Sequence, residues 1–311
     1  MTLQQLRYLC AIVDHDLNLS NASDTLHRSQ PGVSRYVRTL EDELGTRLFV
    51  RSGKRLVALT KAGEAILGVA RRMLADAGTI SQIGREFSAK DEGDLTVATT
   101  HTHARYVLPK TIKAFIDRYP KVRLSLRQGN PTEIAEWIAA GEADLSIAAE
   151  PLTPVRNLIL LPCYQLMRIV LAKPDHEVLQ LKKVTLADLA QHPMITYDSL
   201  FTGRAKIAEE FRRAGLSPRI VMSATDADVM KTYVKMGIGI AIAASIVYDP
   251  TLDASIRMRD VSHLFPPNTI YVGMAKDSYL RSYAYDFIEM FEPSLTRKAV
   301  DAAFSAAILS E

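Results

Sequence analysis

The chain has 311 residues, of which 48% are hydrophobic and 23% are charged, and its formal net charge is +3. This length predicts two or three domains, and the composition excludes a disordered chain. The positive excess is too small to indicate nucleic-acid binding by itself, so the distribution of charge along the chain has to decide.

The cysteine content and the N-terminus both favour a cytoplasmic protein. Cys10 and Cys163 are too few and too far apart for a disulfide framework or a CxxC metal site, which fits a reducing compartment. Charges at Arg7, Asp14 and Asp16 interrupt the first apolar residues, so we expect no signal peptide. No run approaches the roughly 18 apolar residues of a membrane span, so we expect no membrane association.

The N-terminal segment predicts three helices. Residues 3–14 place their apolar side chains on one face. Ser20 is expected to cap a short second helix, and Ser29 a third helix over residues 30–43. Two helices joined by a short turn form the helix-turn-helix pattern. Segments 47–51 and 55–59 then flank a Ser-Gly-Lys turn and predict a basic β-hairpin, or wing.

A long helix is expected over residues 60–90, with Thr60 as its cap. Its apolar residues recur at spacings of three and four, and they are Ala62, Ile66, Val69, Met73, Ala77, Ile80, Ile83 and Phe87. A stripe of this length predicts a coiled-coil seam and therefore a dimer interface. Packing of the helix on its own domain is the alternative.

Strands and helices alternate after the polar segment 91–94. Strands are predicted at 95–99, 122–126, 143–148, 168–172, 194–197, 219–222, 238–242 and 269–273, and helices at 103–118, 131–140, 204–214, 226–236 and 279–291. This order predicts parallel sheet in two α/β lobes with a cleft between them. The predicted domains are a winged helix-turn-helix at 1–59, a linker helix at 60–90 and an effector-binding domain at 91–311, with lobe I at about 91–161 and 267–311 and lobe II at about 162–266.

Positive charge is concentrated between Leu26 and Arg55. This segment carries seven Lys and Arg against three acids, a balance of +4 that exceeds the +3 of the whole chain. Arginine suits both phosphate pairing and bidentate contact with base edges. The predicted DNA-binding residues are Gln30, Ser34 and Arg35 for base edges, Arg28, Arg38, Arg51, Lys54 and Arg55 for phosphates, and Ser29 at the helix start. A solvated basic helix is the alternative, and the adjoining wing and long helix count against it.

These segments resemble LysR-type transcriptional regulators. The resemblance is carried by the runs SQPGVSR, LEDELGTRLFVR and LTKAGE in the N-terminal part. In the C-terminal part, PCY, FTGRA, ATDADVMKTYV and LRSYAYDFIEMF are similar to CysB-type members, which govern sulfur assimilation. The resemblance covers nearly the whole chain and implies an all-α winged helix-turn-helix followed by a two-lobed α/β sensor like the periplasmic binding proteins.

The resemblance also implies the partners. The chain is expected to bind double-stranded promoter DNA, to form a homodimer through the linker helix and a homotetramer from two such dimers, and to contact RNA polymerase. The genes it implies are those of sulfur assimilation or organosulfur utilisation. A LysR-type regulator of an unrelated pathway is the first alternative.

Three threonine-bearing segments, 99–102, 201–204 and 224–226, each lie between a strand and a helix. Helix N-termini and hydroxyl groups offer hydrogen-bond donors to an anion, so a small anionic effector is expected where they converge. Simple capping of each helix is the alternative. The resemblance implies effector contacts for Thr100, Thr102 and Thr202, and Thr225 joins them by its position.

Three positions depart from the CysB-type pattern, since His103 replaces Gln, Ala149 replaces Thr and Leu166 replaces Trp. These changes remove hydroxyl and aromatic contacts and add an ionisable ring. The effector therefore stays open among O-acetylserine, N-acetylserine, sulfate, thiosulfate and an organosulfur compound. Glu150 and Tyr197 complete the predicted effector-binding residues.

Other functional classes are less consistent with the sequence. His101 and His103 stand two residues apart without a third ligand nearby, so no metal site is expected. The chain lacks GxSxG, P-loop, HExxH and dinucleotide-binding motifs, so neither an enzyme nor a cofactor is predicted. A solute-binding protein would have a signal peptide and begin near Gly93, and an enzyme on a two-lobed fold would turn over a substrate without needing DNA.

Overall fold

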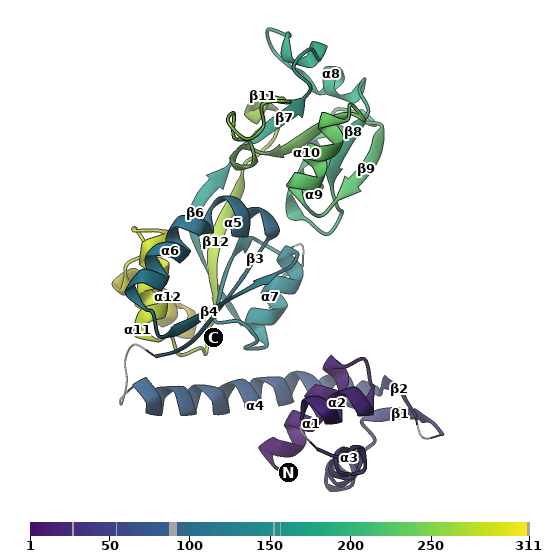
Figure 1. The fold of residues 1–311 in the computed structure, drawn as a ribbon, viewed down its shortest axis with the longest axis vertical. Helices are drawn as coiled ribbons and strands as arrows, with labels where there is room; N and C mark the ends of the chain where they lie inside the picture. The colour runs from purple at the N-terminus through teal and green to yellow at the C-terminus, as the bar shows by residue number, and fades with distance from the viewer. Residues whose placement is uncertain (27, 54, 87–91, 152, 156, 310–311) are drawn as a thin grey trace. The chain divides into compact units, whose positions relative to one another are not determined.

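The computed structural model describes residues 1–26, 28–53, 55–86, 92–151, 153–155 and 157–309 (Figure 1). The chain forms two compact units, one containing Met1–Lys90 and the other containing Asp91–Ala139 and Ala143–Glu311. Within the described ranges, no helix has both the length and the hydropathy needed to cross a bilayer.

The N-terminal unit is a three-helix bundle with a wing and a long fourth helix. Its elements are α1 (Leu3–Asp14), α2 (Leu19–Thr25), α3 (Gln30–Leu44), β1 (Phe49–Ser52), β2 (Arg55–Leu59) and α4 (Lys61–Glu86). The apolar faces of the helices meet in one core, in which Leu9, Val33 and Leu40 are fully buried. Strands β1 and β2 pair in antiparallel register and form the predicted wing.

The helix starts were predicted with mixed success. Thr60 begins α4 as expected, because its Oγ1 accepts a hydrogen bond from the Gly63 N–H at 3.0 Å. The cap of α2 was predicted wrongly, since Asn18 precedes the helix in an extended conformation and its Oδ1 accepts from the N–H of Ser20 at 3.0 Å. Ser29 stands at the N-cap position of α3 but makes no side-chain capping bond.

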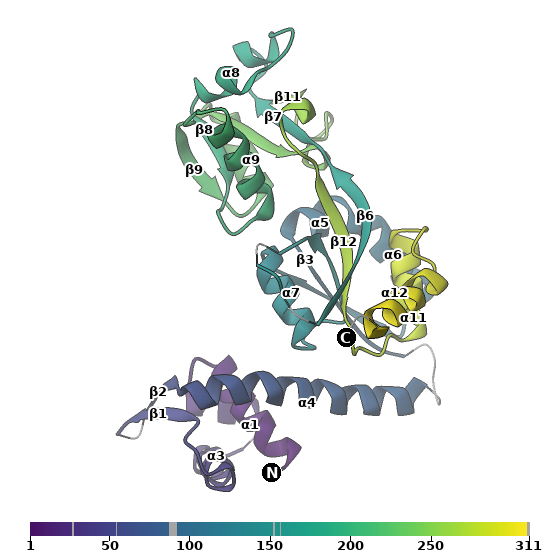
Figure 2. The same cartoon turned by 180° about the vertical axis from the view of Figure 1, so that it is seen from behind.

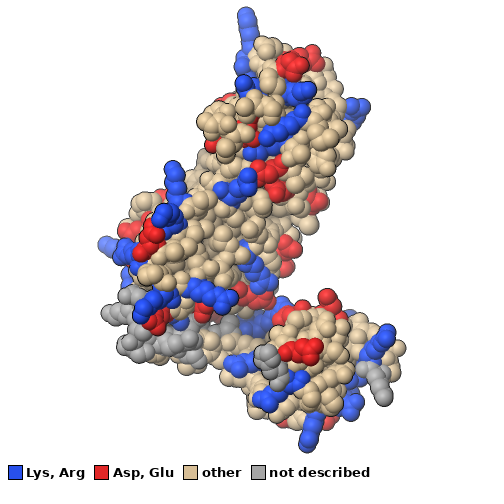
Figure 3. All heavy atoms as spheres, viewed as in Figure 1, with Lys and Arg blue, Asp and Glu red and all other residues tan. Residues whose placement is uncertain are grey.

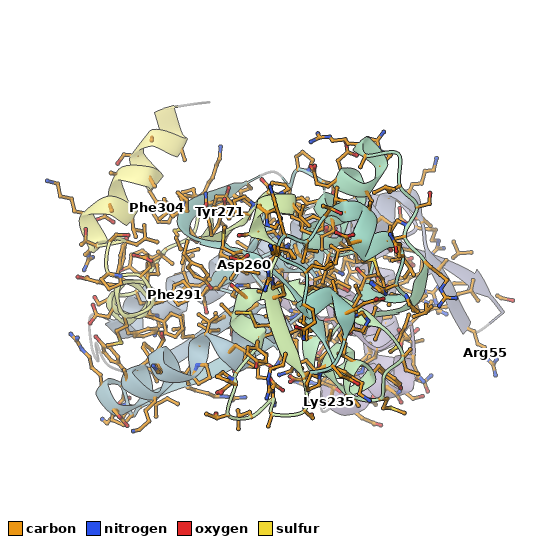
Figure 4. The ribbon with its side chains drawn as sticks, turned by 90° about the horizontal axis from the view of Figure 1, so that it is seen from above. Arg55, Lys235, Asp260, Tyr271, Phe291 and Phe304 are labelled. Carbon is orange, nitrogen blue, oxygen red and sulfur yellow. The ribbon has the colours of Figure 1, made fainter. Side chains whose placement is uncertain are left out.

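The first lobe of the C-terminal unit is built on a mixed five-stranded sheet in the order β4-β3-β5-β12-β6. Its strands are β3 (Gly93–Thr99), β4 (Val122–Gln128), β5 (Leu145–Ala149), β6 (Leu158–Leu166) and β12 (Asn268–Ala275), and its helices are α5 (His101–Tyr106), α6 (Leu108–Arg118), α7 (Pro131–Ala139), α11 (Ser282–Phe291) and α12 (Arg297–Leu309). Helices α11 and α12 pack Phe291 and Phe304, labelled in Figure 4, against the core.

The second lobe contains a sheet in the order β11-β7-β10-β8-β9. Its strands are β7 (Arg168–Ala172), β8 (Met194–Tyr197), β9 (Ile220–Ala224), β10 (Ile240–Ala244) and β11 (Arg257–Asp260), and its helices are α8 (Leu186–Ala190), α9 (Thr202–Arg213) and α10 (Ala227–Lys235), with short 3-10 turns η1 (Glu177–Leu179), η2 (Ser245–Val247) and η3 (Ser262–Leu264). The long strands β6 and β12 run from the first lobe toward the second in both views (Figures 1 and 2).

Three structural expectations need correction. The sheets are mixed instead of wholly parallel, because β12 pairs antiparallel with both β5 and β6. Strand β6 was not predicted, and because it ends at Leu166 the sheet of the first lobe extends past the expected boundary near residue 161. The helix expected over 103–118 is two helices that meet at Val107, where Pro109 in the first turn of α6 lacks an N–H to continue the preceding helix.

Candidate nucleic-acid interface and ligand pocket

Helix α3 presents the predicted DNA-binding residues on the face away from the core. Val33, Val37 and Leu40 are buried beneath it. The residues on its outer side or just before it are Arg28, Ser29, Gln30, Arg35 and Arg38, all exposed, and Ser34, which is half-buried. In the described part of the chain, no ion pair holds the guanidinium of Arg28, Arg35 or Arg38. These side chains are therefore available to a polyanion.

The wing contributes further basic residues. Arg55 is exposed and projects from the β-hairpin (Figure 4), and it lines a hollow together with Asn18, Ser20 and Gln30. Arg51 is less available, because its side chain is 23% exposed and its Nη2 lies 3.4 Å from an oxygen of Glu41. Lys54, the remaining predicted phosphate contact, lies outside the described residues. Lys and Arg side chains project from several places on this unit (Figure 3).

Glu41 has a structural role that its place in an acidic run does not indicate. It is 1% exposed, and Oε1 accepts hydrogen bonds from the N–H groups of Leu48 at 2.9 Å and Phe49 at 3.3 Å. Oε2 lies 3.1 Å from Nη1 of Arg47. Burial raises the pKa of this carboxyl, but the hydrogen bonds outweigh burial and hold the pKa below its usual value. The buried, charged carboxylate of Glu41 thus connects α3 to the start of the wing.

A small cavity of about 60 Å³ lies between the two lobes of the C-terminal unit. Seven of the nine predicted effector residues line it, namely Thr100, Thr102, His103, Ala149, Leu166, Tyr197 and Thr202. Strands β5, β6 and β8 and the starts of α5 and α9 bring these residues together. The other two lie elsewhere: Thr225 lines a different cavity with His101 and Asp226, and the Glu150 carboxylate lies 3.5 Å from Lys206.

Two of the predicted hydroxyl groups already have partners inside the protein. Thr100 Oγ1 lies 2.7 Å from Nδ1 of His103. Thr202 Oγ1 donates to the main-chain oxygen of Glu150 at 2.6 Å, which joins the second lobe to the first. Both hydroxyls therefore have a hydrogen-bond partner without a ligand, and these bonds help to fix their positions.

His103 is a buried neutral imidazole. Its side chain is 3% exposed, and burial lowers its pKa to about 4. Its Nε2 atom has no hydrogen-bond partner in the described structure. The ring therefore offers one unsatisfied nitrogen without a positive charge at neutral pH.

Arg168 lines the same cavity and was missed from the sequence. It opens strand β7 and is 3% exposed, and neither Nε nor Nη2 has a hydrogen-bond partner. No carboxylate of the described residues forms an ion pair with it. Burial lowers the pKa of the guanidinium and the nearby Tyr197 raises it, but arginine stays protonated at neutral pH. An uncompensated buried charge costs on the order of 3 kcal/mol or more.

The sequence carried part of the signal for Arg168, because this arginine begins the predicted strand 168–172, which is otherwise wholly apolar. The structure adds that all five residues of the strand are buried. Charged residues are almost never fully buried unless they are paired, so a buried arginine without a partner is a candidate binding residue. Asn268, at the start of β12, was also missed, and its Oδ1 is buried without a partner.

The two lobes also meet through α5 and α10. His101 Nε2 lies 2.9 Å from Asp226, and Arg105 Nε lies 2.7 Å from Asp228. The hydroxyl of Tyr106 donates to Asp228 at 2.5 Å. His101 and His103 therefore contact different partners. The ring of His101 and the carboxylates of Asp226 and Asp228 lie within 4.8 Å of one another, and Asp226 also caps α10 by accepting from the Asp228 N–H.

Comparisons with known proteins agree with both units. The family model described as the LysR substrate binding domain matches residues 88–296, and the model described as bacterial regulatory helix-turn-helix protein, lysR family, matches residues 3–64. The HTH-type transcriptional regulator CysB of Burkholderia cenocepacia is 45% identical over 303 residues, which is 97% of each chain.

Two further comparisons extend this agreement. The HTH-type transcriptional regulator SsuR of the same organism is 44% identical over 308 residues, covering 99% of this chain and all of the relative. The crystal structure of the cofactor-binding domain of the Cbl transcriptional regulator superposes with a TM-score of 0.64 at 40% identity, covering 68% of this chain and 92% of that one. The chain therefore belongs to the LysR family of transcriptional regulators, with an N-terminal DNA-binding helix-turn-helix and a C-terminal two-lobed domain for a small-molecule effector.

Proposed function

We propose that this regulator controls genes of sulfur assimilation or organosulfur utilisation in response to a small anion bound between its lobes. The gathering of seven predicted effector residues around one cavity supports the position of the site. The similarity to CysB and SsuR over nearly the whole chain supports the sulfur-related role. The effector candidates are O-acetylserine, N-acetylserine, sulfate, thiosulfate and an organosulfur compound.

On the DNA side, we infer that Gln30, Ser34 and Arg35 contact base edges, while Arg28, Arg38, Arg51, Lys54 and Arg55 face the phosphates and Ser29 lies at the helix start. The exposure of Gln30 and Arg35 on the first turns of α3 supports this division, because those turns of a recognition helix reach the bases. The expected assembly is a homodimer through α4 and a homotetramer of two such dimers, working in the cytoplasm with RNA polymerase at the promoter.

The DNA assignment is tested by comparing two arginine variants on specific and random duplexes over a salt series. Arg35→Ala should lose about 1–3 kcal/mol of discrimination between the two duplexes, since it removes a base contact. Arg55→Ala should weaken both complexes alike and reduce the slope of log K against log salt by about one. Full discrimination by Arg35→Ala in fluorescence anisotropy would contradict the assignment of α3.

The effector assignment is tested by calorimetry and by DNA-binding measurements with each of the five candidates. At least one should bind the full-length protein and change its affinity for promoter DNA, because a ligand between the lobes alters their equilibrium. Thr100→Val combined with Thr202→Val should weaken that binding while the protein stays folded. Absence of any DNA response to every bound sulfur compound would favour a regulator of an unrelated pathway.

A further inference from the structure

The guanidinium of Arg168 lies against the N-terminus of helix α9. A Cβ built on Gly203, the second residue of this helix, would lie 2.4 Å from Nη2 of Arg168 and 3.0 Å from Nδ2 of Asn268. Glycine at this position therefore allows the guanidinium and the amide to approach the helix end closely. Arg168, Asn268 and the start of α9, here called the cation corner, all line the cavity between the lobes.

Two sources of positive charge meet in the cation corner. A helix N-terminus carries about half a positive charge and has N–H groups without partners in the helix. The Arg168 side chain adds a full positive charge, is 3% exposed and leaves Nε and Nη2 unbonded. Among the described residues, no carboxylate pairs with it. The arrangement is unfavourable when empty and becomes favourable when an anion occupies the corner.

The cavity lining also contains apolar side chains. They belong to Ala149, Leu166 and Ile270, of which Leu166 and Ile270 are 5% and 1% exposed. These side chains can contact hydrocarbon but donate no hydrogen bonds, and inorganic sulfate has no hydrocarbon to place against them. A ligand that carries both an anionic group and a hydrocarbon part would satisfy both kinds of lining.

We propose that the effector is a compact organic monoanion whose oxyanion group binds Arg168, Asn268 and the N-terminus of α9, and whose apolar body contacts Ala149, Leu166 and Ile270. This inference rests on the proposed effector site and names its ligand class. Alkanesulfonates and short carboxylates share this chemistry, while inorganic sulfate and thiosulfate do not. The small volume of the cavity favours a short body.

The test measures binding of four probes to the full-length protein by calorimetry. Propane-1-sulfonate and butanoate are organic anions with a tetrahedral and a planar anionic group. Inorganic sulfate is an anion without a hydrocarbon chain, and propylammonium has the hydrocarbon chain with a positive charge. Propane-1-sulfonate or butanoate should bind at least tenfold more tightly than sulfate, and propylammonium should not bind. Sulfate binding as tightly as both organic anions would overturn the ligand class.

Arg168→Met tests the anchor. This variant should lose at least tenfold in affinity for the organic anion, yet melt at the same or a higher temperature without ligand, because it removes an unpaired buried charge. Arg259→Met is the matched control in the same lobe, since Nη2 of Arg259 donates to the main-chain oxygens of Leu181 at 2.6 Å and Lys182 at 2.9 Å, away from the cavity. The control should melt at a lower temperature and keep its affinity.

Gly203→Ala provides a second test that leaves the charge in place. The added methyl group should push the guanidinium from the helix end and weaken binding of the organic anion severalfold. Unchanged affinity in both Arg168→Met and Gly203→Ala would overturn the inference. If the anions bind as expected but leave DNA binding unchanged, the proposed function fails while the ligand class stands, so the two failures are distinguishable.

Discussion

His103 links the chemistry of the cavity to the stability of the fold. Its imidazole is buried and its pKa is lowered to about 4, whereas a histidine in an unfolded chain titrates near 6.5. Between these values the unfolded chain takes up a proton that the folded chain does not. The stabilisation due to His103 is therefore fully present above about pH 6.5 and is lost as the pH falls toward 4.

We predict that the free energy of unfolding of the sensor decreases by about 3 kcal/mol between pH 7 and pH 4 because of this residue. His103→Gln removes the titrating group, keeps a side chain that can bond to Thr100 and should reduce this loss. Urea unfolding of both proteins at several pH values measures the effect. A difference between the two proteins that stays constant from pH 7 to pH 4 would contradict the burial of a neutral imidazole.

The candidate site could be located from the sequence only in part. Thr100, Thr102 and Thr202 were predicted because hydroxyls beside helix starts and the family resemblance both indicated them, and they do line the cavity. The hydrogen bond from Thr202 to the main-chain oxygen of Glu150 joins residues that are 52 positions apart, and no local pattern reveals it. Arg168 and Asn268 are single residues at strand starts, and only burial in three dimensions shows that they lack partners.

At the scale of elements, α5 and α10 form a polar contact between the lobes. Asp228 is its central residue, because Tyr106 donates to it at 2.5 Å and Arg105 Nε lies 2.7 Å away, both from α5. Lys231 of the same helix as Asp228 lies 3.3 Å from it. Since the lobes enclose the cavity, a contact of this kind stabilises the arrangement in which ligand is enclosed.

Asp228→Asn should therefore speed ligand release severalfold while leaving the melting temperature of the free protein within a few degrees. The partly exposed ion pair contributes about 0–1 kcal/mol, and the hydrogen bond from Tyr106 about as much. Stopped-flow displacement of a bound effector measures the rate. Asp117→Asn is the matched control, because Asp117 pairs with Lys113 on the exposed face of α6. Equal release rates in the two variants would contradict a role for the α5–α10 contact.

The elements themselves followed from the sequence where a local period was strong. Helix α3 and strands β7 and β8 carry clear apolar patterns and were predicted within a few residues. Strand β6 was missed because a proline, Pro162, and alternating exposure weaken its pattern, and its stability comes from pairing with β12 over its full length. The break at Val107 was missed because apolar spacing continues across it, so only Pro109 marked the boundary.

At the scale of the whole molecule, the exposed apolar residues of α4 bear on how two chains associate. Helix α4 carries the apolar stripe from which a dimer was predicted, and its last residue, Phe87, lies outside the described residues. The described side chains of the stripe fall into two groups. Ile66 packs against the core of its own unit, whereas Val69, Met73 and Ile80 are 46%, 36% and 72% exposed. Isolated exposed apolar residues are common, but a row at helical spacing on one helix favours a partner helix.

The double variant Met73→Asp with Ile80→Asp should therefore convert the assembly to smaller species without unfolding the winged helix-turn-helix, because both side chains lie outside its core. Two charges buried in a helix–helix seam cost more than the seam gains from a few apolar contacts. Sedimentation velocity at micromolar concentration measures the outcome, and Arg72→Asp, on an exposed neighbouring position of α4, controls for added charge.

Loss of dimer should also weaken binding to a two-half-site operator far more than binding to a single half-site, because the two DNA-binding domains would no longer be joined. If the double variant sediments as the wild-type protein does, the exposed row on α4 is not the dimer seam.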